Sequence, residues 1–227
     1  VSCHSLCNGS ASVNVSGGNP GYTYLWNDPM AQTNALANNL CAGNYIVDVT
    51  DANGCTTSAT ITINEPAPLQ SSITGVDVSC HNACNGSADL TVFGGTPGYT
   101  FNWNDPNNSS SEDISALCAG TYAVTISDAN GCIQTENITI NQPSPLSLSA
   151  SSLNSNCGNS DGQVSVQVTG GTPNYSFQWD DPSASSTSSV SNLLAGIYNV
   201  TVTDSNGCIE NTSIPISDNS PASISYP

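Results

Sequence analysis

The stretch YIVDVTDANGC, residues 45–55, combines the period of a β-strand with the chemistry of a hairpin turn. Tyr45, Val47 and Val49 occupy every second position, and this period of two is typical of a strand with one buried face. The strand is followed by Asp-Ala-Asn-Gly at residues 51–54, in which Asn-Gly favours the positive φ angles of a tight turn. The stretch therefore predicts a strand that leads into a β-hairpin.

The chain repeats this stretch, so it is built from copies of one module. The Asn-Gly-Cys ending occurs at residues 53–55, 130–132 and 206–208, and a tryptophan occurs at residues 26, 103 and 179. The first two copies hold four cysteines each at matching positions, namely Cys3, Cys7, Cys41 and Cys55, then Cys80, Cys84, Cys118 and Cys132. The third copy keeps only Cys157 and Cys208. The sequence thus predicts three modules.

Short Pro-rich joints at residues 65–68, 142–145 and 219–221 separate the copies. Six or seven short strands per copy predict an all-β fold, a tandem array of three small Ig-like β-sandwich modules stapled by disulfides. The predicted modules are residues 1–66, which lack a leading strand, residues 67–143 and residues 144–220. The last residues, 221–227, are predicted to be the leading strand of a following repeat or a strand donated to the next subunit.

The charge balance excludes several classes of partner. The 227 residues include 17 acidic side chains and no Lys or Arg, which gives a formal charge of −17. Without cations the chain cannot neutralise phosphates, so no nucleic-acid binding is expected, and no apolar run has the length needed for membrane insertion. Ten cysteines in a chain rich in Asn, Ser, Thr and Gly indicate disulfides and a secreted protein, extracellular or on a bacterial cell surface.

The cysteines missing from the third copy suggest how the others pair. Ser160 and Leu194 stand where its second and third cysteines would be, and partners tend to be lost together because an orphan thiol is reactive. We therefore predict one bridge common to all copies and an inner bridge in the first two copies. The common bridges are Cys3–Cys55, Cys80–Cys132 and Cys157–Cys208, and the inner bridges are Cys7–Cys41 and Cys84–Cys118.

The motifs of the second copy point to a known family. They read Gly95-Thr96-Pro97-Gly98-Tyr99, Phe101-Asn102-Trp103, Leu117-Cys118-Ala119-Gly120-Thr121-Tyr122 and Asp128-Ala129-Asn130-Gly131-Cys132. This set resembles the SprB-type repeats of large secreted surface adhesins of gliding bacteria. The resemblance implies an extracellular, repeated, β-rich stalk or adhesin segment without catalytic residues. The inner cysteine pair departs from the plainer two-cysteine form of the family and implies tighter stapling.

The Asp-x-Asn-Gly loops are candidate calcium sites, because they carry oxygen ligands that echo the start of a calcium-binding loop. The candidate ligands are Asp51, Asn53, Asp128, Asn130, Asp204 and Asn206. They lack the later ligands of an EF-hand, so the alternative is a hairpin turn that needs no metal. Calcium is the one cofactor that the sequence suggests.

Other candidate sites are weaker. The Cys3-His4 and Cys80-His81 pairs resemble zinc ligands, but the third copy has Gly158 in place of the histidine and disulfides explain the same cysteines. No Ser-His-Asp or Cys-His arrangement has supporting motif context, so no enzyme is predicted. Aromatic residues at positions 22, 24 and 26 face away from polar neighbours, which places them in the core rather than on a sugar-binding surface.

Two Asn-x-Ser/Thr acceptors lie on outward-facing strand positions, Asn14 and Asn199, and are candidate glycosylation sites. Glycans at these positions would suit a hydrated fibre surface. Exposed loops such as residues 104–113 are candidate contacts for surface carbohydrate.

The leading hypothesis is a non-catalytic extracellular structural repeat protein that forms part of a cell-surface fibre or adhesin stalk. Its main partner would be itself, either as neighbouring repeats of one long array or as subunits joined head to tail when residues 222–226 complete the next chain. The alternatives are a carbohydrate- or calcium-dependent adhesive module and the spacer region of a secreted multidomain enzyme.

Overall fold

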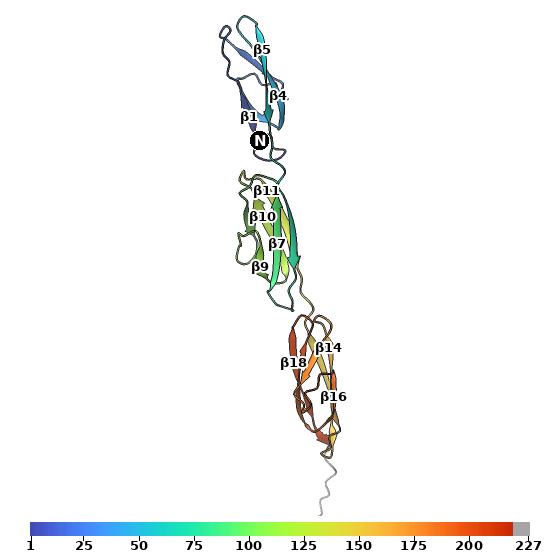
Figure 1. The fold of residues 1–227 in the computed structure, drawn as a ribbon. Coiled ribbons are helices and arrows are strands. Elements are labelled where there is room, and N and C mark those ends of the chain that lie inside the picture. Colours follow the sequence, from blue (N-terminus) through green and yellow to red (C-terminus); the bar gives the residue numbers. More distant parts are fainter. Residues whose placement is uncertain (220–227) are drawn as a thin grey trace, which may run out of the picture. The chain divides into compact units, whose positions relative to one another are not determined.

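The computed structural model describes residues 1–219, in which every regular element is a β-strand (Figure 1). These residues contain no helix long and apolar enough to cross a membrane. By its internal contacts the chain divides into two compact units. The first unit comprises residues 1–74, 89–114 and 122–138, and the second comprises residues 75–88, 115–121 and 139 onward, so that the division passes through the middle repeat.

The third repeat is a sandwich of two antiparallel three-stranded sheets. One sheet has the order β12-β14-β16, with bounds Ser147–Leu153, Gly162–Thr169 and Ser189–Leu193. The other has the order β15-β17-β18, with bounds Ser176–Trp179, Gly196–Thr203 and Ile209–Ile216. In the letters used for immunoglobulin domains these are the A-B-E and C-F-G sheets, which confirms the Ig-like prediction. A short parallel pair, β13 (Ser155–Asn156) and β19 (Asp218–Asn219), closes the far end.

The first repeat has the same topology with one strand fewer. Its C-F-G sheet is β2-β4-β5, with bounds Thr23–Trp26, Gly43–Thr50 and Thr56–Ile63. Its other sheet contains only β1 (Gly9–Ser12) and β3 (Leu36–Leu40). Within residues 1–219 no strand pairs with the second edge of β1, in keeping with the predicted lack of a leading strand.

The middle repeat has the full set of six strands. They form the sheets β6-β7-β9 (Gln70–Val76, Gly86–Phe93, Ile114–Leu117) and β8-β10-β11 (Thr100–Trp103, Gly120–Ser127, Ile133–Ile140). All sheets fall inside the ranges 1–66, 67–143 and 144–220, although those boundaries themselves stay an interpretation of the repeat. The strand predicted at residues 221–227 lies outside the described residues.

Each core is built around the repeated tryptophan. Trp26, Trp103 and Trp179 are 1–2% exposed, and the alternating strand residues pack around them in the first and third repeats. Each indole N–H donates a hydrogen bond to a backbone carbonyl eight residues later, at 2.8–3.0 Å. A buried indole needs such a partner, and the bond fixes the loop after the tryptophan strand. The predicted core position is confirmed for the tryptophans, while Tyr22 and Tyr24 are partly buried and pack against the core of the first repeat.

Candidate functional site: the disulfide-linked joints

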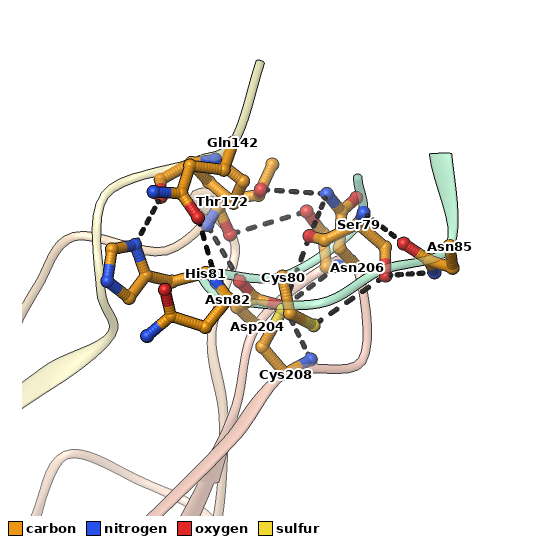
Figure 2. The surroundings of a disulfide bond; sticks show 12 residues. Ser79, Cys80, His81, Asn82, Asn85, Gln142, Thr172, Asp204, Asn206 and Cys208 are labelled. Carbon is orange, nitrogen blue, oxygen red and sulfur yellow. Dashed lines mark hydrogen bonds between the residues drawn. A yellow bond between two sulfur atoms is a disulfide. The ribbon is translucent and has the colours of Figure 1, made fainter. Parts of the chain in front are cut away.

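Two disulfides join consecutive repeats rather than the ends of one repeat. Cys3 of the first repeat bonds Cys132 of the second, with a Cα–Cα distance of 5.8 Å. Cys80 of the second repeat bonds Cys208 of the third, with a Cα–Cα distance of 5.7 Å (Figure 2). We call the surroundings of these bonds the first joint and the second joint. Each joint lies wholly within one of the two compact units.

The predicted bridges Cys3–Cys55, Cys80–Cys132 and Cys157–Cys208 are therefore wrong. Strand length gives the reason, because Cys55 precedes the eight-residue strand β5, whereas the Val1 amine donates to the carbonyl of Asn64 just beyond its other end. Eight strand residues span roughly 26 Å, and a disulfide requires Cα atoms within about 7 Å. The first and last cysteines of one repeat lie at opposite ends of the module. The structure leaves Cys55 and Cys157 as exposed free thiols.

The two inner bridges form as the sequence predicts, Cys7–Cys41 and Cys84–Cys118. In the first repeat Cys7 lies just before β1 and Cys41 just after β3, and these strands pair with Gly9 opposite Leu40. The inner bridge thus ties the ends of two strands that are already hydrogen-bonded.

A hairpin turn presents the second cysteine of each joint. In the second repeat Asp128 accepts hydrogen bonds from three backbone N–H groups, those of Thr96, Asn130 and Cys132, at 2.8–2.9 Å. Gly131 has a φ of 80°, which a glycine adopts without strain, and its N–H donates to the Asp128 carbonyl. One carboxylate therefore shapes the turn, holds the cysteine backbone and ties both to the Gly-Gly-Thr-Pro loop.

An asparagine of the same turn reaches across each joint. Asn130 Nδ2 donates to the Ser2 carbonyl at 2.9 Å and to Thr96 Oγ1 at 2.8 Å. In the second joint Asn206 Nδ2 makes the equivalent bonds to the Ser79 carbonyl and to Thr172 Oγ1, at 3.0 and 2.9 Å (Figure 2). The residue before the bonded cysteine is thus hydrogen-bonded to the partner repeat in both joints.

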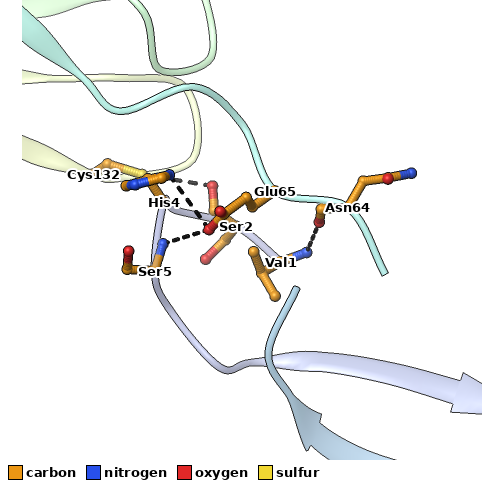
Figure 3. A network of polar contacts seen from close by, with 7 residues as sticks. All are labelled: Val1, Ser2, His4, Ser5, Asn64, Glu65 and Cys132. Atoms are coloured by element: carbon orange, nitrogen blue, oxygen red, sulfur yellow. Dashed lines mark hydrogen bonds and ion pairs between the residues drawn. The ribbon is translucent and has the colours of Figure 1, made fainter. Parts of the chain in front are cut away.

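Acidic or amide side chains of the linkers hold the loop that follows the first cysteine. In the first joint Glu65 Oε2 accepts the Ser5 N–H at 2.7 Å and lies 3.4 Å from His4 Nδ1 (Figure 3). In the second joint Gln142 Oε1 accepts the Asn82 N–H at 2.9 Å. The end of one repeat and the beginning of the same repeat are therefore locked together beside the bridge.

The linkers also bind directly to the repeat that follows. Gly95 N–H donates to the Ala67 carbonyl at 3.0 Å, and Gly171 N–H donates to the Ser144 carbonyl at 2.9 Å. A Cβ atom at Gly94 would overlap the carbonyl oxygen of Pro68, so this close approach of two backbones requires glycine. Each linker is a packed part of the joint rather than a free tether.

The turn carboxylates are held in the ionised form. The Thr96 N–H, followed by the N–H groups of Cys132 and Asn130, lowers the pKa of Asp128 below its usual value. Burial works to raise the pKa of Asp204, but the hydrogen bonds from Thr172, Cys208 and Asn206 outweigh it and the pKa is lowered. Both groups are therefore negatively charged at neutral pH.

The candidate calcium ligands Asp51, Asn53, Asp128, Asn130, Asp204 and Asn206 all lie in these turns. Their carboxylates accept three backbone N–H groups each, which accounts for the aspartates as turn-forming residues. Among residues 1–219 no three His, Cys, Asp or Glu side chains gather as metal ligands. Calcium binding stays a prediction from the sequence.

The two predicted glycan acceptors differ in their surroundings. Both Asn14 and Asn199 are exposed. Asn199 Nδ2 donates to Asp180 Oδ2 at 2.6 Å, and its Oδ1 accepts the Ser213 hydroxyl, so this amide is already engaged. No hydrogen bond of the Asn14 side chain is found in the described part of the chain, which makes Asn14 the more accessible candidate.

The family model described as the SprB repeat matches residues 1–31, 72–108 and 149–184, and each match contains the first cysteine and the tryptophan of one repeat. The resemblance seen in the sequence is thus confirmed for three segments of the chain, each of which matches the SprB repeat. A search of curated proteins finds no match.

Solved structures show only distant similarity. The N-terminal eight Ig domains of Down Syndrome Cell Adhesion Molecule isoform 1.30.30 align with a TM-score of 0.39 and 11% identity over 95% of this chain. This chain spans about a third of that protein's length, 34%. The IG1+IG2 structure of DIP-gamma aligns with a TM-score of 0.34 and 12% identity over 66% of this chain and 97% of that chain.

Proposed function

Starting from the three SprB repeat segments, we propose that this chain is a load-bearing, non-catalytic segment of an extracellular fibre or adhesin stalk. The observation that carries the proposal is the overlap of its two joint disulfides. Cys3–Cys132 encloses residue 80, and Cys80–Cys208 encloses residue 132, so the two covalent loops are interleaved along the chain. This pairing is suited to carrying tension between repeats.

The interleaving gives two covalent routes between the joints. One route follows the backbone from Cys132 to Cys208, and the other follows it from Cys3 to Cys80 and crosses the second disulfide. A break of any one peptide bond between Cys3 and Cys208 therefore leaves the two ends of the chain covalently connected. An unbridged string of domains would be severed by the same break.

Other features agree with an exposed surface structure. Four disulfides favour an oxidising, extracellular setting. The formal charge of −17 with no Lys or Arg favours solubility and self-repulsion between neighbouring fibres. In the first and third repeats the tryptophan rings are buried in the cores, and the tyrosines that contact these cores are buried or partly buried. The proposal therefore assigns this chain the role of a stalk rather than of a carbohydrate-binding surface.

Immunogold electron microscopy of the producing cells tests this function. We expect antibodies against the purified chain to label fibres on the cell surface. A membrane-impermeant phosphine reductant should then increase the breakage of labelled fibres under shear flow, because it removes the second covalent route. Label confined to the cell interior, or fibres whose survival under shear is unaffected by full reduction of the bridges, would overturn the proposal.

A further inference from the structure

The two free cysteines occupy the two positions that are disulfide-bonded in each joint. Cys55 occupies the position that Cys132 and Cys208 occupy in the later repeats, and Cys157 occupies the position of Cys3 and Cys80. Each of the two joint bridges connects the first cysteine of one repeat to the last cysteine of the following repeat. Cys157 therefore lacks a following repeat and Cys55 lacks a preceding one within the described residues, where both thiols are exposed.

The surroundings of Cys157 share two backbone hydrogen bonds with those of a bonded first cysteine. Gly158 N–H donates to Asp218 Oδ1 at 3.0 Å, as Ser5 N–H donates to Glu65 and Asn82 N–H to Gln142. Asn156 N–H donates to Asp161 Oδ1 at 2.8 Å, as Ser79 N–H donates to Asn85 in the second joint. Two backbone contacts that flank a bonded first cysteine are thus present around Cys157, although the turn begins one residue earlier, at Asn156, and Cys157 has a φ of 51°.

The surroundings of Cys55 match those of a bonded last cysteine. Asp51 accepts the N–H groups of Asn19, Asn53 and Cys55 at 2.9–3.0 Å, which reproduces the turn around Asp128 and Asp204. Asn53 stands where Asn130 and Asn206 donate to the carbonyl before the first cysteine. Gly54 has a φ of 82°, equal to that of Gly207.

From this we propose that Cys157 of one copy of this chain forms a disulfide with Cys55 of a second copy, which creates a third joint of the same kind between molecules. The inference rests on the proposed function and names its partner and its bond. A heterologous contact of this kind leaves one unused half on each of the two copies, so it can propagate from copy to copy. Both halves are carried by one chain, which makes a second copy a complete and sufficient partner.

The bond forms by thiol–disulfide exchange with a small-molecule disulfide such as oxidised glutathione. The Cys157 thiolate attacks one glutathione sulfur and releases one reduced glutathione. The Cys55 thiolate of the second copy then attacks the Cys157 sulfur of the mixed disulfide and releases the second reduced glutathione. One disulfide forms, one is reduced, and the two thiol protons pass to the released glutathione thiolates.

Mixing two single variants tests the pairing. In Cys55→Ser only Cys157 is free, and in Cys157→Ser only Cys55 is free, so each variant alone cannot propagate. With oxidised glutathione we expect the wild type to give a ladder on non-reducing denaturing gels and the equimolar mixture to give a single heterodimer. Heterodimer formation should be at least tenfold faster than dimerisation of either variant alone, and mass spectrometry should find the Cys157–Cys55 peptide pair.

Asn53→Ala separates a docked joint from chance collision of thiols. We expect it to slow heterodimer formation severalfold while the reaction of Cys55 with a small thiol reagent is unchanged. Equal rates for heterodimer and homodimers, or a monomer that closes Cys55 on its own Cys157, would overturn the inference. These outcomes leave the fibre labelling and its sensitivity to reduction untouched, so failure of this inference is distinguishable from failure of the proposed function.

Discussion

The disulfide pairing sets the greatest length to which the chain can be pulled, and single-molecule force spectroscopy measures that length. The shortest covalent route from Cys3 to Cys208 runs, in order, through Cys132, Cys118, Cys84 and Cys80. It contains about 18 backbone residues, which span roughly 65 Å when fully extended. The three bonds crossed have Cα–Cα distances of 5.8, 3.8 and 5.7 Å, so the limit is about 80 Å.

Removing one bridge lengthens this route by a predictable amount. In the Cys84→Ser/Cys118→Ser double variant, the shortest remaining route passes through Cys7–Cys41 and contains about 43 residues, or roughly 165 Å with its two bonds. With every bridge reduced, the full chain between Cys3 and Cys208 is free, and its about 205 residues extend to roughly 740 Å. The expected limits are therefore three distinct lengths separated by two steps.

The assay pulls the full chain between handles fused to its two ends after the free thiols have been alkylated. The handles and terminal residues add the same length to every variant, so differences between variants report the route alone. Pairing within repeats, as Cys3–Cys55, Cys80–Cys132 and Cys157–Cys208, would give a route of about 50 residues and a limit near 200 Å. A wild-type limit near 200 Å that does not change in Cys84→Ser/Cys118→Ser would refute the interleaved pairing.

Three further predictions concern the bridges and the turns. Ser110→Arg places one trypsin site in an exposed loop of a chain that has no other Lys or Arg. We expect the cleaved protein to run at full mass on non-reducing denaturing gels and as two pieces after reduction. Two pieces without reductant would contradict the bridges that span residue 110, namely Cys3–Cys132, Cys84–Cys118 and Cys80–Cys208. Cys7→Ser/Cys41→Ser opens a loop with a sequence separation of 34. Closing such a loop in the unfolded chain is worth about 3.8 kcal/mol of stability, so hydrogen exchange of the β4 amides should be faster by about 600-fold. The amides of β17, in the third repeat, serve as the control whose exchange rate should not change. The pKa values of Asp128 and Asp204 are lower in the folded state than in the unfolded state, where they are about 3.9. These carboxylates therefore stabilise the fold at pH values above about 3.9, and they lose this contribution as the pH falls through their folded-state pKa values. The melting temperature should therefore drop as the pH falls below about 4, and Asp128→Asn should reduce that slope; a slope unchanged by the substitution would show that other groups cause it.

The fold could be predicted from the sequence because the patterns that determine its strands and turns are local. The alternation at Tyr45, Val47 and Val49 predicts β4, and the buried face of that strand is the one that carries these three residues. The strand order also agrees with the Ig-like prediction. These features follow from a period of two and from turn chemistry, which neighbouring residues alone decide.

The joint bridges could not be predicted in the same way. The simultaneous loss of two cysteines in the third repeat correctly identifies the inner pair. Cys7 and Cys41 lie close together because they flank strands that pair with each other. For the outer cysteines the sequence offers no distance, and a pairing within a repeat or between repeats leaves the same repeat pattern. The deciding quantity is the length of β5, which separates Cys55 from the end of the module that holds Val1.

The interleaved pairing changes the meaning of the inner bridge. The covalent route from Cys132 to Cys80 across the middle repeat is short only because the Cys84–Cys118 bridge provides a shortcut. This route runs along β10, the central strand of its sheet. The inner bridge thus limits the extension of the repeat and also stabilises its fold. In the third repeat Ser160 and Leu194 replace this pair.

In an array joined through Cys157 as proposed above, the third repeat would differ from the other two under load. The shortest covalent route from the first joint to Cys157 is the backbone from Cys132, which has about 25 residues and spans roughly 90 Å when extended. A repeat with its inner bridge has a route of about 18 residues, or roughly 65 Å. The first two repeats would hold their length once the backbone between cysteines is taut. The middle and third repeats would therefore share one covalent limit of roughly 90 Å. In the repeat without an inner bridge, the backbone between Cys132 and Cys157 would limit the extension in place of that bridge.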